Sequence, residues 1–286
     1  MKKILVTGGN GQLGNSLRKV SKDNADYEFV FTDYHHLDIT SKEDISNFLE
    51  GKDFFAIINC AAYTAVDQAE SDIEKARELN SMGPLNLAIE SEKRGIGLIH
   101  ISTDYVFGNT KNTPIHPLDT DTIPNSIYGM TKLEGEENIK HNHSSYIIIR
   151  TAWLYCEFGN NFVKSMLRIG NERESLNVVY DQVGSPTYAI DLANVIIRAL
   201  DILKPMTKEV VHYTNEGVCS WYDFAKKIME IRGINCVINP IVSQQYSAAA
   251  PRPSYSVLDK QPIKDLLLIT IPHWEDSLKE CLKRIK

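Results

Sequence analysis

A tyrosine and a lysine four residues apart, Tyr128 and Lys132 in the stretch YGMTK, could carry proton-transfer chemistry. The stretch LEGEENI that follows is typical of a helix, and residues at i and i+4 share one helical face. A nearby ammonium favours the phenolate, so Lys132 is expected to lower the pKa of Tyr128 from a reference of about 10. Such a phenol can exchange a proton with a substrate oxygen while hydride moves at the neighbouring carbon. Two exposed helix residues would show the same spacing, so the pair depends on its surroundings.

A hydroxyl group is expected beside this pair. The apolar stretch GLIHIS at 97–102 is typical of a strand, and Ser102, Thr103 and Asp104 end it. The carboxyl ends of parallel strands face the ligand crevice in open α/β sheets. Thr103 is therefore expected to hydrogen-bond the reacting oxygen next to Tyr128.

A glycine-rich loop, TGGNGQLG, lies between the first predicted strand and the first predicted helix. Gly8, Gly11 and Gly14 have the spacing that allows a tight turn, close approach of backbone to a pyrophosphate, and close packing of helix on strand. The helix N-terminus would then present free N–H groups to the anion. Glycines also join strands to helices without any ligand, but the position in a βαβ unit favours a dinucleotide site.

The residue that could select the dinucleotide is Asp33, at the end of the second predicted strand and 19 residues after Gly14. A carboxylate there can accept hydrogen bonds from ribose hydroxyls and disfavours a 2′-phosphate, which points to NAD(H). A turn former or helix cap is the plain alternative. His35 and His36 would soften the preference, so NADH and NADPH both remain open as cofactors.

The first half of the chain alternates apolar strands with helical patterns. Strands this continuously apolar are typical of a parallel sheet covered on both faces. The second half is less regular, and residues 240–259 are expected to be a loop. Strands are predicted at 3–7, 27–33, 54–62, 97–102, 146–153 and 210–214, and helices at 11–22, 41–50, 72–93, 129–141, 160–170, 189–203, 221–233 and 272–286.

We therefore predict an α/β fold, a doubly wound Rossmann sheet with a smaller C-terminal substrate-binding lobe over its open end. The dinucleotide-binding domain is expected to comprise residues 1–150 plus about 186–215. The lobe is expected to comprise about 151–185 and 216–286.

Composition and charge exclude several classes of protein. The 286 residues are 43% hydrophobic and 24% charged, with a formal net charge of -6. No basic stripe or polybasic helix suggests a nucleic acid or a membrane surface as a partner. The longest apolar runs are strand-length, and glycines interrupt the N-terminal apolar stretch too early for a signal peptide. A cytoplasmic protein is expected.

No metal or disulfide is expected either. The five cysteines are widely spaced without a C-x-x-C pair, and the eight histidines show no ligand spacing. Cys60, in the run AIINCAA, is expected to be a buried, inert thiol. Trp221 and Phe224 are expected in the core, and the acidic run after Lys132, KLEGEEN, as a solvated helix face.

The motifs together make the sequence similar to the extended short-chain dehydrogenase/reductase family. TGGNGQLG, NCAAYTAVDQAE, LNSMGPLNLA, STDYVFG and YGMTKLEGE carry this resemblance, which runs from residue 1 to about 260. STDYVF, RTAWLY, GNNFVKSML and DQVGSPT are similar to the members that reduce nucleotide-linked 4-keto sugars. The resemblance implies a nucleotide-sugar substrate and NADPH or NADH as cofactor.

The resemblance also implies residue roles at matching positions. The implied catalytic set is Thr103, Tyr128 and Lys132. The implied cofactor-binding set is Gly8, Gly11, Gln12, Leu13, Asp33, Asp38, Ile39, Ala61, Ala62, Tyr63 and Asn80, together with Tyr128 and Lys132. The implied substrate-binding set is Val66, Asp67, Thr103, Asp104, Trp153 and Arg252.

Reduction fits this set better than dehydration does. Dehydratases of the family carry an Asp-Glu pair after the threonine, whereas here Tyr105 follows Asp104, so the second carboxylate for eliminating water is missing. Two alternatives stay open: a reductase or epimerase of another nucleotide sugar, and a non-catalytic dinucleotide-binding regulatory subunit. The intact Thr103, Tyr128 and Lys132 speak against the second.

Quaternary structure is the last expectation. Some reductases of this group dimerise around a magnesium ion held by glutamates. This chain has Asn15 at one such position and Tyr188, Ala189 and Ile190 near the other. A metal-bridged dimer is therefore not expected, while an ordinary homodimer stays open.

Overall fold

A six-stranded sheet forms the centre of the molecule, in the order β10-β5-β4-β3-β1-β2 with every neighbouring pair parallel. The computed structural model describes residues 1–108, 111–119 and 122–285. The strand order reverses beside β1, which is the position where open α/β sheets bind ligands. The strands are β1 (Lys2–Thr7), β2 (Tyr27–Phe31), β3 (Phe54–Asn59), β4 (Gly97–Thr103), β5 (Tyr146–Thr151) and β10 (Lys208–His212).

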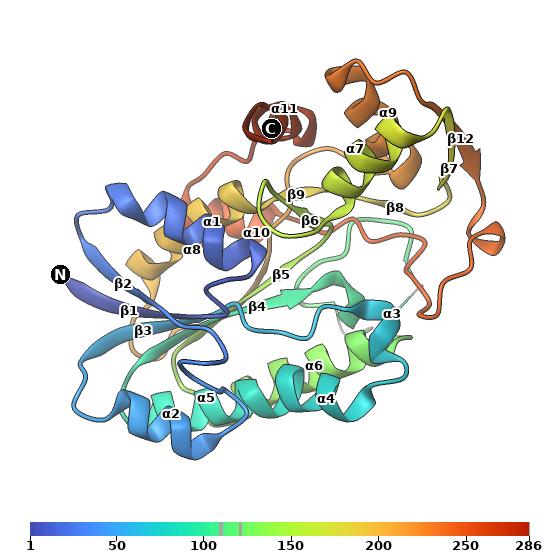
Figure 1. The fold of residues 1–286 in the computed structure, drawn as a ribbon. Coiled ribbons are helices and arrows are strands. Elements are labelled where there is room, and N and C mark those ends of the chain that lie inside the picture. The colour runs from blue at the N-terminus through green and yellow to red at the C-terminus, as the bar shows by residue number, and fades with distance from the viewer. Residues whose placement is uncertain (109–110, 120–121, 286) are drawn as a thin grey trace.

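Helices cover both faces of the sheet (Figure 1). One layer contains α2 (Lys42–Leu49), α4 (Ile73–Arg77), α5 (Gly83–Glu92) and α6 (Ile127–Asn142). The opposite layer contains α1 (Gln12–Val20) and α8 (Ala189–Ile202). Successive strand residues point to opposite faces, so Ile4 and Val6 join one core cluster while Leu5 joins the other. The predicted α/β Rossmann fold is confirmed.

A smaller lobe lies beyond one end of the strands (Figure 1). Its short strand pairs were not predicted from the sequence, and β12 extends into the stretch 240–259 that was expected to be a loop throughout. Each pair joins segments far apart in the chain, so neither segment has enough periodicity by itself. The lobe and closing elements are β6 (Leu154–Tyr155), α7 (Phe162–Glu172), β7 (Ser175–Val179), β8 (Val183–Gly184), β9 (Thr187–Tyr188), β11 (Cys219–Ser220), α9 (Trp221–Arg232), β12 (Val237–Ile241), α10 (Gln261–Leu267) and α11 (Trp274–Arg284).

The prediction of one continuous helix over 72–93 is wrong in one respect. A π-helical turn, Glu78–Met82, separates α4 from α5. Pro84 explains it, because proline has no N–H to donate to the carbonyl four residues earlier and its ring crowds that carbonyl, here the one of Asn80. Such π-turns often occur at functional sites. The short helix α3 (Val66–Ala69), which precedes α4, was also missed.

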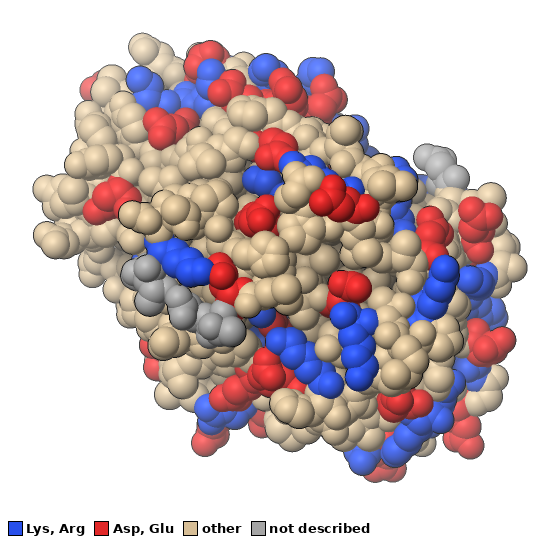
Figure 2. All heavy atoms as spheres, turned by 180° about the vertical axis from the view of Figure 1, so that it is seen from behind, with Lys and Arg blue, Asp and Glu red and all other residues tan. Residues whose placement is uncertain are grey.

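Charges of both signs are interspersed over the face drawn in Figure 2, without a large patch of one sign. Within the described ranges, no helix is both long and apolar enough to cross a membrane.

Helix α6 lies close to the π-turn at Gly135, where an added Cβ would lie 2.1 Å from the carbonyl oxygen of Asn80. Gly135→Ala should lower the free energy of unfolding by about 1–3 kcal/mol, because the helix must move away from this backbone atom. In open space the same change would stabilise the helix by about 0.5–1 kcal/mol. Urea unfolding measures the difference, and Glu137→Ala on the exposed side of α6 is the control, expected within about 0.5 kcal/mol of wild type. A stabilised Gly135→Ala variant would contradict the close approach.

Candidate active site

The predicted catalytic residues come together at the carboxyl edge of the sheet. Thr103 ends β4, and Tyr128 and Lys132 lie on the first two turns of α6, which Ser126 caps by accepting a hydrogen bond from the backbone N–H of Gly129 at 3.1 Å. All three catalytic candidates are buried or half-buried. This grouping was expected from the sequence, and the fold explains it because α6 packs against β4 after the connection 104–126.

Tyr128 differs from the expectation in its protonation. Burial raises the pKa of Tyr128 to about 12, and hydrogen bonding with Thr103 opposes that rise only in part. The expected lowering of this pKa by Lys132 is therefore wrong in this arrangement, since burial outweighs any effect of the ammonium. The ring of Tyr105 packs edge-on against Tyr128 with centroids 5.4 Å apart, which helps to exclude water. The phenol is held protonated, as a proton donor requires.

Lys132 is buried against β4, and its side-chain nitrogen donates to the carbonyl oxygen of Ile101 at 2.7 Å. Burial lowers the pKa of Lys132 to about 8. The nitrogen also lies 3.2 Å from Nε2 of His100, a fully buried residue that the sequence analysis did not select. His100 stands two residues before Ser102 in the same strand, which was the available signal.

A buried ion pair supports this wall of the site. Arg150 on β5 donates to both carboxylate oxygens of Glu136 at 2.9 and 2.6 Å, and Ser102 donates to one of them at 2.5 Å. Glu136 lies one turn after Lys132 and is fully buried, so the prediction that KLEGEEN is a solvated face is wrong at this position. The neighbouring Glu134 and Glu137 fit it, since both are substantially exposed.

The glycine loop fits a pyrophosphate cradle. Gly8 has φ +67°, and a Cβ there would lie 2.6 Å from the backbone nitrogen of Ala61. A Cβ at Gly14 would lie 2.4 Å from the carbonyl oxygen of Gly8. Only glycine leaves the loop this close to β3 and to the start of α1, with Gly11 as the N-terminal cap of that helix. Leu13 points into the core, so only its backbone can face a ligand.

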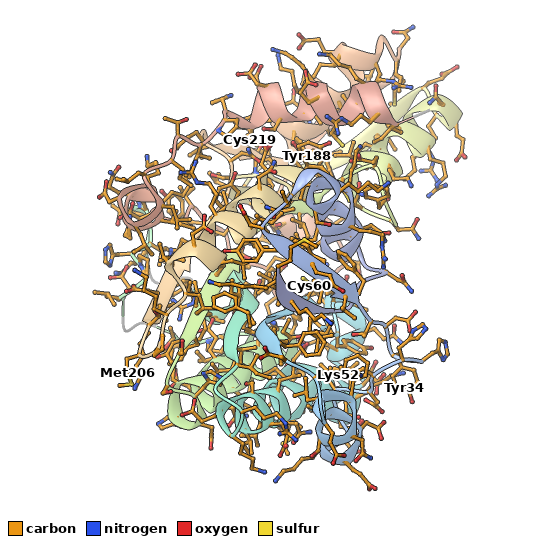
Figure 3. The ribbon with its side chains drawn as sticks, turned by 90° about the vertical axis from the view of Figure 1, so that its left-hand side faces the viewer. Tyr34, Lys52, Cys60, Tyr188, Met206 and Cys219 are labelled. Carbon is orange, nitrogen blue, oxygen red and sulfur yellow. The ribbon has the colours of Figure 1, made fainter. Side chains whose placement is uncertain are left out.

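Asp33 lies at the far side of this loop, after β2. Its carboxylate accepts from the amide of Asn10 and lies 2.5 Å from Nδ1 of His36. Hydrogen bonding with His36 is the main cause that lowers the pKa of Asp33. Tyr34 projects from the surface next to it (Figure 3).

Asp38 and Ile39, two of the implied cofactor-binding residues, have side-chain contacts within the local fold. Asp38 accepts from the backbone N–H and the hydroxyl of Thr40 at 2.9 and 2.7 Å. Ile39 is buried in the core cluster that contains Leu5, where its side chain lies next to Gly83. Gln12 accepts from Asn161 of the lobe at 3.0 Å, which ties the glycine loop to that part of the chain.

The loop after β3 is held by Asn80. The Asn80 side chain accepts from the backbone N–H of Tyr63 at 2.8 Å and donates to the Tyr63 carbonyl at 3.0 Å. Ala61 and Ala62 precede this clamp and are half-buried beside the glycine loop. Asn80, on the π-turn, thus fixes the position of the loop after β3.

The substrate-side candidates bridge the two parts of the molecule. Arg252 forms two hydrogen bonds to Asp67 on α3, at 2.9 and 2.6 Å, and Asp67 also accepts from the backbone N–H of Ala250 at 3.0 Å. Val66, beside Asp67, is half-buried. These hydrogen bonds connect the segment around Arg252 to α3.

Trp153, two residues after β5, has φ +49°, a left-handed conformation that costs energy for a bulky residue. Its ring stacks on Trp221 with centroids 3.6 Å apart and an angle of 10° between planes. Trp221 was expected in the core, but it is only half-buried and supports Trp153, whereas Phe224 is fully buried as expected.

Asp104, directly after β4, is a buried carboxyl. It accepts from the hydroxyl of Thr103 at 3.0 Å, and its Oδ2 atom has no hydrogen-bond partner within the described residues. Burial raises the pKa of Asp104 to about 6. Cys60, directly after β3 (Figure 3), was expected to be buried and is half-buried; desolvation raises its pKa to about 12, in agreement with the expected inert thiol.

Comparison with known proteins gives matches over the whole chain. The family model described as RmlD substrate binding domain matches residues 1–286. The spore coat polysaccharide biosynthesis protein SpsK of Bacillus subtilis is 38% identical over 99% of this chain and 98% of its own. The dTDP-4-dehydrorhamnose reductase of Aggregatibacter actinomycetemcomitans is 38% identical over 98% of both chains.

A solved structure agrees with the fold in detail. The crystal structure of dTDP-4-dehydrorhamnose reductase from Bacillus anthracis, in complex with NADP, is 37% identical with a TM-score of 0.94. The match covers 99% of this chain and 100% of that one.

The raised pKa of Asp104 predicts a pH-dependent gain for Asp104→Asn. A raised pKa means that this group stabilises the fold fully below about pH 4 and loses that contribution as the pH rises through about 6. The variant should equal wild type near pH 4 and exceed its free energy of unfolding by about 2–3 kcal/mol above pH 7. Urea unfolding at the two pH values measures this.

Asp119→Asn is the control of opposite sign. The hydrogen bond from Lys111 lowers the pKa of Asp119, so this variant should lose stability at neutral pH. An Asp104→Asn variant whose advantage does not grow with pH would show that the carboxyl is solvated.

Proposed function

The chain belongs to the RmlD substrate binding domain family, and from this premise we propose that it reduces the C4 ketone of dTDP-4-dehydro-L-rhamnose to dTDP-L-rhamnose. It is an NAD(P)H-dependent oxidoreductase that acts on a nucleotide sugar. One observation carries the proposal: Thr103, Tyr128 and Lys132 stand together beside a glycine loop in a chain that matches a named reductase over 98% of its length.

Tyr128 is the proton donor in this proposal. Its raised pKa keeps the phenol protonated until a stronger base, the alkoxide that develops at C4, takes the proton. Thr103 hydrogen-bonds the same oxygen and fixes its position. When bound, the reduced nicotinamide supplies the hydride. Lys132 donates to ribose hydroxyls and places the nicotinamide nucleotide next to Tyr128.

Cofactor and substrate would occupy opposite sides of these three residues. Gly8, Gly11 and the start of α1 would hold the pyrophosphate, and Asp33 the adenosine ribose. We propose that residues 1–150 with about 186–215 form this dinucleotide-binding domain.

The lobe, about 151–185 and 216–286, would hold the sugar nucleotide through Trp153 and Arg252. Asp67 and Val66 would complete this side from α3, and Asp104 from the end of β4. Because Arg252 and Asp67 are paired with one another, the substrate would have to take over one of these partners.

The resemblance to the Bacillus subtilis spore coat protein supports a role in supplying a sugar for cell-surface polysaccharide. A reductase or epimerase of another nucleotide sugar stays as the alternative, because the substrate-side residues do not identify the sugar. An epimerase keeps its dinucleotide through turnover, so the dinucleotide content of the purified protein distinguishes the two. We also propose that any homodimer forms without a bridging metal.

The test is oxidation of NADH and NADPH by the purified protein with dTDP-4-dehydro-L-rhamnose, followed at the nicotinamide absorbance. Tyr128→Phe should lower kcat by about 100-fold or more while leaving dinucleotide affinity within a factor of about two, because only the proton donor is removed. Tyr180→Phe, a substantially exposed tyrosine outside the site, is the matched control and should turn over like wild type.

Wild-type turnover by Tyr128→Phe would refute the assignment of the proton donor. Dinucleotide binding without turnover in the wild-type protein would instead favour the alternative sugar or the regulatory subunit.

Cofactor choice gives a separate prediction. Asp33→Asn should raise the NADPH to NADH ratio of kcat/KM roughly tenfold, equivalent to about 1.4 kcal/mol, because it removes the carboxylate that repels a 2′-phosphate. His36→Gln should lower the same ratio, because it removes the ring that partners Asp33. Equal ratios in all three proteins would show that the adenosine ribose lies elsewhere.

A further inference from the structure

A chain of buried polar groups runs across the sheet to Lys132. The hydroxyl of Thr7 on β1 donates to Oδ1 of Asn59 on β3 at 2.7 Å. The amide nitrogen of Asn59 lies 3.0 Å from Nδ1 of His100 on β4, and Nε2 of His100 lies 3.2 Å from the nitrogen of Lys132. All four residues are almost fully buried. The proposed reaction uses only the last of them.

The orientation of the Asn59 amide is determined by the backbone. The N–H of Ala61 donates to Oδ1 of Asn59 at 3.1 Å, and an N–H can only face an oxygen. The NH₂ group of Asn59 must therefore face His100. An amide nitrogen only donates, so Nδ1 of His100 is the acceptor and carries no proton.

His100 then presents a donor to Lys132. Burial holds the pKa of His100 well below its ordinary value, so the ring is neutral and its one proton is on Nε2. This N–H points at a lysine nitrogen that already donates to Ile101. An ammonium has three donors and no acceptor, whereas a neutral amine has a lone pair. The geometry therefore favours the amine.

The charges around Lys132 do not reverse this preference. The titratable groups that face it are His100 from β4, Cys60 from the end of β3, and Tyr128 and Glu136 from α6. Glu136 is engaged by Arg150 and Ser102. No carboxylate lies within ion-pair distance of Lys132 among the residues that the structure describes.

We propose that His100, oriented by Asn59, is a positioning residue that favours the neutral amine of Lys132 before dinucleotide binds, and that binding is coupled to uptake of one proton by Lys132. The inference rests on the proposed function, in which Lys132 donates to ribose hydroxyls. Those oxygens accept from an ammonium, which must give up the contact with His100. The proton comes from the solvent, and no bond other than this N–H is formed.

The direction of the pH dependence follows. Burial lowers the pKa of Lys132 to about 8, and the hydrogen bond from His100 acts in the same direction because protonation removes it. Contact with ribose hydroxyls raises the pKa of the bound state toward its ordinary value. Affinity for the dinucleotide is then constant at low pH and falls as the pH rises above the lower of the two pKa values.

The experiment is calorimetric titration of the full chain with NADH between pH 6.5 and 9.5, in pairs of buffers that differ in ionisation enthalpy. We expect close to one proton taken up per NADH at about pH 9, and an affinity that falls about tenfold per pH unit there. Without a sugar substrate, no turnover interferes. Lys132→Met should bind NADH more weakly, with no proton uptake at any pH.

Asn59→Asp tests the orienting role without a change of shape. A carboxylate accepts a hydrogen bond from Nδ1–H of His100, so the proton of the neutral ring resides on Nδ1 and Nε2 becomes an acceptor for the Lys132 ammonium. Uptake at pH 9 should fall to less than half of the wild-type value. Thr7→Val is the matched control, because the N–H of Ala61 still orients Asn59, and its uptake should equal that of wild type.

Three outcomes would overturn the inference: NADH binding by the wild-type protein without proton uptake, uptake that persists in Lys132→Met, or an unchanged Asn59→Asp variant. The first two decide the question even where Asn59→Asp does not fold. Absence of any NADH binding would instead refute the proposed function, and this inference with it.

Discussion

The burial of the Lys132 amine is the constraint on which the site depends. A cation taken out of water needs a partner or loses its proton, and Glu136, a carboxylate one helical turn away, is already paired with Arg150. The fold therefore surrounds the amine with a carbonyl from Ile101 and a donor from His100. This arrangement requires Thr7, Asn59 and His100 to stand side by side in β1, β3 and β4, because each contributes one group to the chain of hydrogen bonds. The parallel sheet supplies that alignment.

The ion pair of Glu136 and Arg150 has a similar role in holding α6. Both groups are buried, and replacing one partner alone would leave a charge without compensation. Ser102 joins the same carboxylate, so the strand that ends in Thr103 and the helix that carries Tyr128 are tied directly together. On its other side the helix meets the π-turn at Gly135. The relative position of the three catalytic candidates is therefore set by contacts on both sides of α6.

Local patterns in the sequence were sufficient to predict the sheet, its covering helices and the grouping of Thr103, Tyr128 and Lys132. They could not predict features that depend on distant partners. Glu136 has the same character in the sequence as its exposed neighbours, and only Arg150, 14 residues later, makes it a buried group. The pairing of β7 with β12 joins segments about 60 residues apart. The raised pKa of Tyr128 depends on the degree of burial, which the spacing of a tyrosine and a lysine does not contain.

Residues assigned to ligands are, in this fold, partners of one another or of the backbone. Asp33 contacts His36, Asp67 holds Arg252, and Lys132 meets His100. Without these partners, each group would lose hydrogen bonds to water at the partly buried edge of the sheet and gain none in return, which costs free energy of folding. A ligand that binds there must replace such contacts, so its net affinity is the difference between two sets of hydrogen bonds. The polar groups proposed to recognise the ligand thus also stabilise the fold. In this proposal, the internal partners of Lys132 and Asp67 set the cost of binding, and the ligand contacts set its gain.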